Sequence, residues 1–149
     1  MQLTQFTDYS LRVLIYLAVL PPSEMTTITA IADHFQISRN HLVKVVNTLA
    51  NLGYVATARG KGGGIQLARP AHTIGLGEVV RQTEPHMNLV ECFDVKTNDC
   101  LLARGCFLKA ALYEARRAFE GVLDKYTLAD AAKSGIGPPR AKNVSTEDA

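Results

Sequence analysis

Residues 38–69 read SRNHLVKVVNTLANLGYVATARGKGGGIQLAR, and they carry the strongest structural signal in the chain. The first part spaces apolar residues three and four positions apart, which predicts a helix with one buried face formed by Leu42, Val45, Val46 and Leu49. Gly53 is suited to end this helix, because glycine readily adopts the left-handed conformation found there. Residues 54–59 and 65–69 are strand patterns around the glycine-rich residues 60–64, which predicts a β-hairpin.

A second helix is predicted directly before this stretch. Residues 28–35 place four apolar side chains on one side, and Thr27 is suited to cap the helix start. A short connection leads to Ser38, which is a second N-cap candidate. Two short helices joined by a tight turn, the second with a polar first turn, are typical of a helix-turn-helix. A hairpin directly behind it is typical of a wing, so the sequence predicts a winged helix.

The glycine run at residues 60–64 has an alternative interpretation as a phosphate-binding nucleotide loop. Such a loop follows a strand, opens a helix and ends in Lys-Ser or Lys-Thr. Neither this context nor this dipeptide follows the glycines. The wing is therefore favoured.

Three shorter helices are expected around this unit. Residues 7–20 repeat apolar side chains at helical spacing and end before two prolines. Residues 75–83 form a short amphipathic segment that ends before Pro85. Another short helix is expected at residues 128–132.

A longer helix is predicted from Cys106 to Tyr126. Its apolar residues alternate at four and three positions, forming a seam of Leu108, Leu112, Ala115, Phe119, Val122 and Tyr126. The seam is shorter than three heptads, so an ordinary core-facing stripe is an alternative to pairing between helices. The chain offers little other apolar surface to cover so long a helix, and most soluble oligomers are two-fold dimers. We therefore expect a homodimer.

Together these elements predict a mainly α fold with a small β-hairpin, in which a winged helix-turn-helix precedes a long dimerisation helix. We expect the winged-helix domain at residues 1–72, followed at residues 73–133 by a loop and the dimerisation helix. The tail at residues 134–149 has two prolines and few apolar residues, which predicts disorder without an assigned function.

Charge is distributed unevenly, although the formal net charge is only +2. Residues 34–76 contain no Asp or Glu but carry several Lys and Arg. A basic stretch in a near-neutral chain indicates a polyanion bound to one surface. Because this stretch overlaps the winged helix, we predict that the domain at residues 1–72 binds double-stranded DNA.

The side chains expected to contact DNA lie at the start of the second helix of the helix-turn-helix and beside the wing turn. In such folds the first side chains of this recognition helix enter the major groove, where Arg suits guanine and Asn suits adenine. Ordinary solvated surface charges are the alternative. The predicted contacts are Ser38, Arg39, Asn40, His41, Lys44, Arg59 and Lys61. A dimer would present two recognition helices about one DNA turn apart, so a near-palindromic operator is expected.

All three cysteines fall within residues 92–106, CFDVKTNDCLLARGC. An odd number cannot pair completely within one chain. Neither a signal peptide nor a membrane-spanning stretch of ~20 apolar residues is evident, so we expect a cytoplasmic protein with reduced thiols and no membrane partner. Three neighbouring thiols favour a soft-metal site that lacks its fourth ligand. Three unrelated cysteines and a structural zinc site are the alternatives.

The cysteines do not point to an enzyme. A thiol oxidoreductase would need a Cys-x-x-Cys pair, which the chain lacks. No convincing nucleophile–base set is evident either. We therefore expect no enzymatic activity.

Several segments together resemble a known family. The opening MQLTQFTDYSLRVLIYLA, the segment SRNHLVKVVNTLANLGYV, the wing RGKGGGIQLA and the three late cysteines are similar to iron–sulfur transcription regulators. The resemblance covers residues 1 to about 132, and SRNHLVK, RGK, GGI and TLAD are most similar to the nitric-oxide-sensing repressors of this family. It implies a homodimer with a winged helix, a long crossing dimerisation helix and an iron–sulfur cluster, with 4Fe-4S favoured over 2Fe-2S.

The resemblance also implies the cluster ligands. They would be the thiolates of Cys92, Cys100 and Cys106 and an aspartate near the start of the first helix of the other subunit, where Asp8 is the matching residue. Other members of the family use a histidine near the cysteines, but His86 precedes Cys92 and does not match it. The cysteine gaps of seven and five residues depart from the family pattern, which leaves the path of the loop open. Asp8 has an alternative role as a favourable acid in the first turn of a helix.

The function implied is that of a DNA-binding transcriptional repressor of nitric-oxide-detoxification genes. Its iron–sulfur cluster would sense nitric oxide, and nitrosylation of the cluster would release the operator. One alternative is a regulator of the same fold that senses iron–sulfur status or redox state. The other is a structural-zinc protein that binds DNA.

Overall fold

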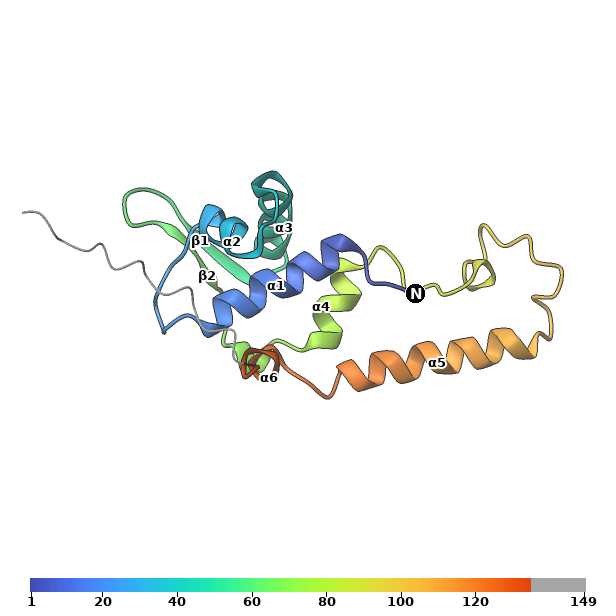
Figure 1. Ribbon diagram of the computed structural model, residues 1–149. Helices are drawn as coiled ribbons and strands as arrows, with labels where there is room; N and C mark the ends of the chain where they lie inside the picture. The colour runs from blue at the N-terminus through green and yellow to red at the C-terminus, as the bar shows by residue number, and fades with distance from the viewer. Residues whose placement is uncertain (135–149) are drawn as a thin grey trace, which may run out of the picture.

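The computed structural model describes residues 1–134 of the 149-residue chain, so the predicted tail at residues 134–149 lies outside the described residues except for its first position. Figure 1 shows a body of packed helices with a small hairpin on one side, and one long helix extending from this body. The elements in chain order are α1 (Gln5–Val19), α2 (Ile28–Phe35), α3 (Arg39–Asn51), β1 (Val55–Ala58), β2 (Gly64–Leu67), η1 (Ala71–Thr73), α4 (Leu76–Thr83), η2 (Glu91–Phe93), α5 (Phe107–Leu123) and α6 (Leu128–Ala132).

Side-chain caps define where the first helices begin. Thr4 Oγ1 accepts a hydrogen bond from the Thr7 amide at 3.3 Å, so α1 starts earlier than the apolar pattern predicted. Thr27 caps α2 as predicted, accepting from the Ala30 amide at 3.1 Å. Each bond satisfies a helix-start amide that has no partner within the helix. Ser38 occupies the predicted N-cap position of α3, but its side chain makes no capping hydrogen bond.

The helix-turn-helix consists of α2, a tight turn and α3. Gln36 turns the chain between the two helices with a left-handed φ of 55°. Gly53 follows α3 with a φ of 81°, which confirms the helix-ending glycine predicted from the sequence. The Tyr54 amide then donates to the Leu49 carbonyl at 2.9 Å as the chain turns into β1.

The wing is an antiparallel pair of β1 and β2 joined by a glycine-rich turn. β2 begins at Gly64, which the sequence pattern had assigned to the turn. A backbone bridge between Thr26 and Ile65 attaches the hairpin to the segment before α2. Gly63 passes so close to the Ala58 carbonyl that a side chain there would clash, which explains one glycine of this turn.

One hydrophobic core joins the winged helix to α4 and α6. Its buried side chains come from α1, α2, α3 and the hairpin, together with Ile74, Val79 and Leu128. Tyr54 is the largest of the fully buried side chains. The core therefore includes residues on both sides of residue 72, and the division of the chain into domains stays a prediction.

The α5 helix stands apart from this core. None of its residues is buried, and Leu108 and Val122 on the seam are 63% and 50% exposed. Figure 1 shows α5 reaching away from the winged helix, with the cysteine-containing loop (residues 92–106) at its far end. The alternative interpretation of the seam, as a stripe that faces the chain's own core, is therefore wrong. Pairing of the seam with a second copy of the chain stays a prediction. Within residues 1–134, neither α5 nor any other helix has the length and apolar composition needed to cross a membrane.

Candidate functional site

The first turns of α3 present a polar surface to solvent. The apolar face of the helix, with Leu42 and Val45, is buried in the core, so the other face points outward. The helix residues predicted to contact DNA are all exposed: Ser38, Arg39, Asn40, His41 and Lys44. Because the Ser38 hydroxyl is not used as a cap, it and the first amides of α3 are available to a phosphate oxygen.

Arg39 is held in position by α2. Its Nε donates a hydrogen bond to Thr29 Oγ1 at 3.1 Å, which leaves the two terminal nitrogens as donors for a ligand. His41 lies beside α1, with its ring centroid 6.4 Å from that of Tyr9. A side chain that is already ordered loses less conformational entropy on binding. Arg39 is therefore well prepared to contact a base.

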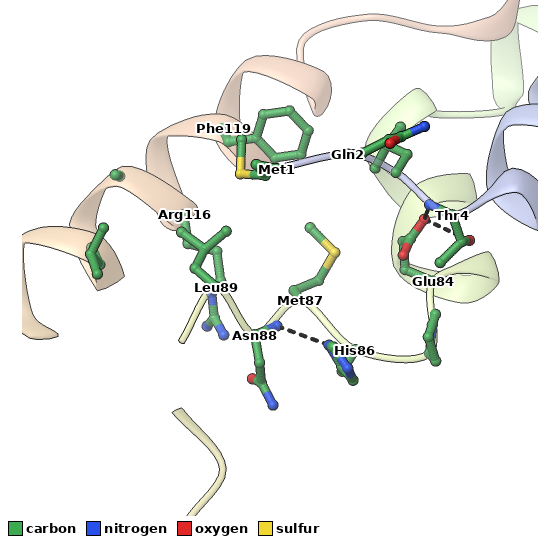
Figure 2. A pocket seen from close by; sticks show the side chains of 14 residues that line it. Met1, Gln2, Thr4, Glu84, His86, Met87, Asn88, Leu89, Arg116 and Phe119 are labelled. Atoms are coloured by element: carbon green, nitrogen blue, oxygen red, sulfur yellow. Dashed lines mark hydrogen bonds between the residues drawn. The ribbon is translucent and has the colours of Figure 1, made fainter. Parts of the chain in front are cut away.

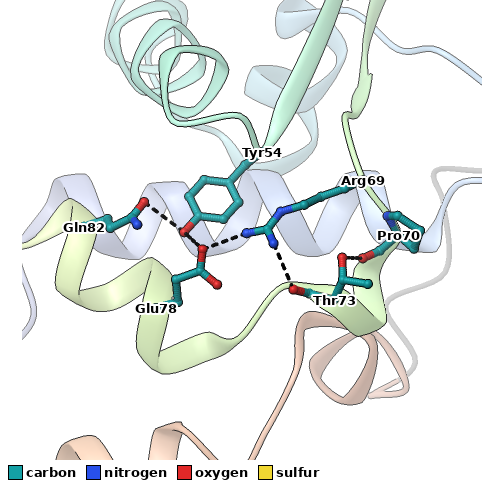
Figure 3. A network of polar contacts seen from close by, with 6 residues as sticks. All are labelled: Tyr54, Arg69, Pro70, Thr73, Glu78 and Gln82. Carbon is teal, nitrogen blue, oxygen red and sulfur yellow. Dashed lines mark hydrogen bonds and ion pairs between the residues drawn. The ribbon is translucent and has the colours of Figure 1, made fainter.

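The wing adds two exposed cations, Arg59 and Lys61, beside its turn. Arg69 at the base of the wing belongs to the same acid-free span but is engaged within the fold. Its guanidinium donates to Glu78 Oε1 at 2.7 Å and to the Thr73 carbonyl at 3.1 Å, as Figure 3 shows. An acid just beyond the span thus neutralises one of its cations.

Tyr54 completes the contact between the wing and α4. Its hydroxyl oxygen lies 2.8 Å from Glu78 Oε1 and 3.0 Å from Gln82 Oε1. A hydroxyl has one proton, which it donates to the carboxylate as the stronger acceptor. Burial raises the pKa of Tyr54, and the hydrogen bond to Glu78 adds to the rise. Burial also disfavours the ionised form of Glu78, but hydrogen bonds from Tyr54 and Arg69 outweigh it and lower the pKa of that carboxyl.

The cysteine-containing loop, residues 92–106, holds three free thiols. Cys106 is the N-cap of α5, and its Sγ accepts a hydrogen bond from the Lys109 amide at 3.4 Å. An amide at a helix start is well placed to stabilise negative charge on sulfur. Cys92 lies in η2 and is half-buried, whereas Cys100 is exposed.

The three thiols suit an iron–sulfur cluster in their chemistry, but one chain does not assemble them into a site. Thiolates are the usual ligands of such clusters, and none of these thiols is used in a disulfide. In the part of the chain that the structure describes, no three His, Cys, Asp or Glu side chains gather as metal ligands. The loop is held instead by local hydrogen bonds, such as that from the Asp99 amide to the Glu91 carboxylate at 2.7 Å.

Asp8 lies far from the cysteines of its own chain. It occupies the first turn of α1, and Figure 1 shows α1 and the cysteine-containing loop in separate parts of the molecule. The carboxylate is 2.9 Å from the Arg12 guanidinium and remains half exposed. His86 does not join the cysteines either, and its Nδ1 accepts a hydrogen bond from the Asn88 amide at 3.4 Å.

A cation–aromatic cluster anchors the cysteine-containing loop to α5. The ring centroids of Phe93 and Tyr113 are 5.6 Å apart. The Arg116 guanidinium lies 4.5 Å from the Tyr113 centroid and 5.5 Å from that of Phe93. Sequence patterns predicted neither this cluster nor the wing contact with α4. The only available signal here was the three-residue spacing of Tyr113 and Arg116, which places them near each other on a helix.

A mostly apolar cavity of about 660 Å³ separates α5 from the start of the chain. Figure 2 shows Met1 beside Phe119 of α5, with Met87 pointing into the cavity from the opposite side. The cavity lies along the predicted dimer seam, which contributes Leu112, Ala115 and Phe119 to its lining. One side of the seam therefore lines this apolar cavity, and the rest of the seam faces solvent.

Sequence comparisons relate the chain to transcriptional regulators. A family model described as "Rrf2: Iron-dependent Transcriptional regulator" matches residues 3–134. The chain is 53% identical over 134 residues to the HTH-type transcriptional regulator NsrR of Bacillus subtilis (strain 168), covering 90% of this chain and 92% of that relative. It is 52% identical over 130 residues to NsrR of Geobacillus kaustophilus (strain HTA426), covering 87% and 88%.

Solved structures agree with this relationship. CymR, the global cysteine regulator of B. subtilis, superposes with a TM-score of 0.72 at 28% identity, covering 89% of this chain and 97% of that chain. IscR of T. potens gives a TM-score of 0.70 at 22% identity, covering 89% and 87%, which is a likeness of fold alone. The predicted mainly α winged-helix fold is thereby confirmed.

The relatives also bear on function. They are named as transcriptional regulators, so the predictions of a DNA-binding regulator and of no enzymatic activity are confirmed. The relatives named NsrR confirm the resemblance seen in the sequence, and the iron dependence in the family description agrees with an iron-containing cofactor. The chain belongs to the Rrf2 family of iron-dependent transcriptional regulators.

Proposed function

We propose that the protein is a homodimeric repressor that binds DNA while it carries an iron–sulfur cluster and leaves its operator when nitric oxide nitrosylates the cluster. One observation carries the proposal: three free thiols share a loop at the end of an unburied helix, in a member of an iron-dependent family. The relatives named NsrR support a repressor. The target genes would encode nitric-oxide detoxification.

On DNA, α3 would enter the major groove and the wing would lie along the phosphate backbone. Arg39 and Asn40 would contact base edges, because their side chains can form paired hydrogen bonds with guanine and adenine. The remaining contacts would come from Ser38, His41, Lys44, Arg59 and Lys61. All seven side chains are exposed in the chain, which supports this assignment.

The dimer would form along α5. The exposed seam residues and the adjoining cavity leave apolar surface in water, and removing it from water is favourable by ~25 cal/mol per Å², which opposes the entropy cost of association. Two chains related by a two-fold axis would direct both α3 helices to one side of the dimer. The operator would then be a near-palindrome of double-stranded DNA.

The cluster ligands would be Cys92, Cys100 and Cys106 of one subunit and Asp8 of the partner subunit. When bound, a cluster held partly by oxygen offers an iron that a small ligand such as nitric oxide can attack, because oxygen is a weak partner for soft iron. Arg12 would orient the Asp8 carboxylate, to which it is already paired at 2.9 Å. Loss of the bond between Asp8 and the cluster of the partner subunit would free α1 and alter the spacing of the two α3 helices.

The visible absorption of anaerobically purified full-length protein tests the cofactor. We expect a coloured protein with about four irons per chain, as for a 4Fe-4S cluster. The Cys100→Ser variant should lose the colour but keep the circular-dichroism spectrum, whereas Ser38→Ala should keep both. A colourless wild-type protein that contains zinc or no metal would contradict the proposal.

A further inference from the structure

One carboxylate fixes both ends of the wing to α4. Glu78 Oε1 accepts hydrogen bonds from the Tyr54 hydroxyl at 2.8 Å and from the Arg69 guanidinium at 2.7 Å (Figure 3). Tyr54 directly precedes β1, and Arg69 follows β2 by two residues. The two donors therefore belong to the two ends of the hairpin, and Glu78 holds both against the same helix.

The wing needs such an anchor, because an isolated two-stranded hairpin is barely stable in water. Each strand has only four residues, and Arg59 and Lys61 at the turn are exposed. The bridge from Thr26 to Ile65 attaches one strand to the segment before α2. Val55 and Ile65 also bury their side chains in the core, and the contact with Glu78 adds a separate polar attachment at the base of the hairpin.

The α4 helix is itself attached to the end of α5 and to the start of α1. Arg81 pairs with Asp124 at the end of α5 at 2.8 Å. Glu84, just after α4, accepts hydrogen bonds from the Thr4 amide at 2.7 Å and from the Thr4 hydroxyl at 2.9 Å, at the start of α1. The base of the wing therefore rests on a helix with little freedom to shift.

We propose that Glu78 is a positioning residue for DNA binding, which holds Tyr54 and Arg69 and thereby sets the orientation of the wing. The cations beside the turn, Arg59 and Lys61, then reach the phosphate backbone. Arg69 acts through Glu78 and makes no phosphate contact of its own. This inference rests on the proposed function, because it requires the wing to touch DNA.

If Glu78 acted only through its charge, its removal would strengthen DNA binding, whereas a positioning role predicts weaker binding. An acid near DNA repels phosphates, so its removal should strengthen binding where only charge matters. DNA affinity falls with salt, and the steepness of log affinity against log salt concentration is called the salt slope. If Arg69 contacted a phosphate, removing Glu78 would free the Arg69 guanidinium for DNA, and removing Arg69 would lower the salt slope by about 0.9. Positioning instead requires that loss of Glu78 weakens binding without changing the salt slope.

The test uses a duplex that the wild-type full-length protein selects from a random-sequence library. Dissociation constants at several salt concentrations are compared for the wild type, Glu78→Gln, Arg69→Gln and the double variant, each corrected for its active fraction by stoichiometric titration. We expect each single variant to bind about fivefold more weakly, which matches the net contribution of about one ordinary hydrogen bond. The double variant should be no weaker than the singles, and all salt slopes should equal that of the wild type.

Two further variants separate positioning from charge and from folding. Glu24→Gln removes the same charge from an exposed acid of the same lobe and should leave affinity unchanged or slightly higher. Tyr54→Phe keeps the buried ring, removes the hydroxyl, and should weaken binding about two- to threefold. Unchanged or tighter binding by Glu78→Gln, or a lower salt slope for Arg69→Gln, would overturn the inference alone. Failure of the wild-type protein to select any duplex would overturn the proposed function and the inference with it.

Discussion

Arg39 and Lys61 are both exposed cations, yet we expect them to contribute differently to DNA binding. Arg39→Gln should cost about 1–3 kcal/mol of discrimination at one base pair, because the Thr29 hydroxyl holds its guanidinium at the start of α3, the end that we propose enters the major groove. Lys61→Gln should weaken binding to all duplexes alike and lower the salt slope by about 0.9. Affinities for the selected duplex and for single-base variants of it measure both effects. Equal losses on all duplexes for Arg39→Gln would contradict a base contact.

Asp130 gives α6 a cap that depends on pH. Its carboxylate accepts hydrogen bonds from the Thr127 amide and hydroxyl and pairs with Lys133, which lowers the pKa from 3.8 to about 2. Because the folded-state pKa lies below the unfolded value, the stabilisation is complete well above pH 3.8 and is lost as the pH falls toward 2. Asp130→Asn should therefore lower the urea midpoint at pH 6, and the gap to the wild type should narrow below pH 4. A gap of constant size would contradict this role.

At the scale of residues, the sequence predicted local roles better than partners. Thr27 and Gly53 behave as expected, because a cap depends on atoms within four residues along the chain. Nothing in the local pattern predicted that Glu78 would meet Tyr54, 24 residues earlier in the chain. The first acid after a long acid-free span was the only signal. Contacts of this kind depend on how whole elements pack.

The α5 helix is the element with the most exposed apolar surface. Leu108→Glu replaces a side chain that is already 63% exposed, so it should cost the single chain little stability while it places a charge in the proposed dimer contact. We expect this variant to be monomeric by analytical ultracentrifugation at concentrations where the wild type is a dimer. Ala110→Glu, which is exposed away from the seam, is the matched control and should remain dimeric. A dimeric Leu108→Glu variant would exclude this seam as the contact.

Periodicity predicted the α-helices and the order of the elements correctly, but not how each element is covered. The start of α1 moved to Gln5 because Thr4 provides a cap that the apolar spacing does not reveal. The seam on α5 and the stripe on α3 have the same kind of spacing, although one is buried in the chain and the other is not. Sequence spacing specifies which residues share a face, and only packing decides what covers it.

At the scale of the whole molecule, the proposed cluster site needs residues from two chains. Within one chain, Asp8 and the cysteine-containing loop lie in different parts of the fold. The sequence alone could suggest this arrangement only through the family resemblance, because no local pattern encodes contacts between subunits. The assignment of Asp8 therefore depends on the dimer, and it can be tested by mixing subunits.

Mixed dimers distinguish a ligand from the partner subunit from one within the same chain. A dimer of one Asp8→Ala chain and one Cys100→Ser chain contains one complete site only if Asp8 serves the other subunit. Such dimers, isolated with two different affinity tags, should show about half the cluster absorption of the wild type. Asp8→Ala homodimers should show weaker or less stable absorption. Mixed dimers with only half the absorption of Asp8→Ala homodimers would contradict ligation across the subunits, because they would then contain a single site without Asp8.

The most direct test of nitric-oxide sensing is the operator affinity of anaerobically purified wild-type protein, measured before and after stoichiometric nitric oxide on the selected duplex. We expect the affinity to fall by ~5–150-fold, which corresponds to a coupling of ~1–3 kcal/mol. The visible absorption recorded in the same samples should change over the same additions of nitric oxide. An operator affinity that stays constant while the absorption changes would contradict the proposal that this protein is a nitric-oxide-responsive repressor.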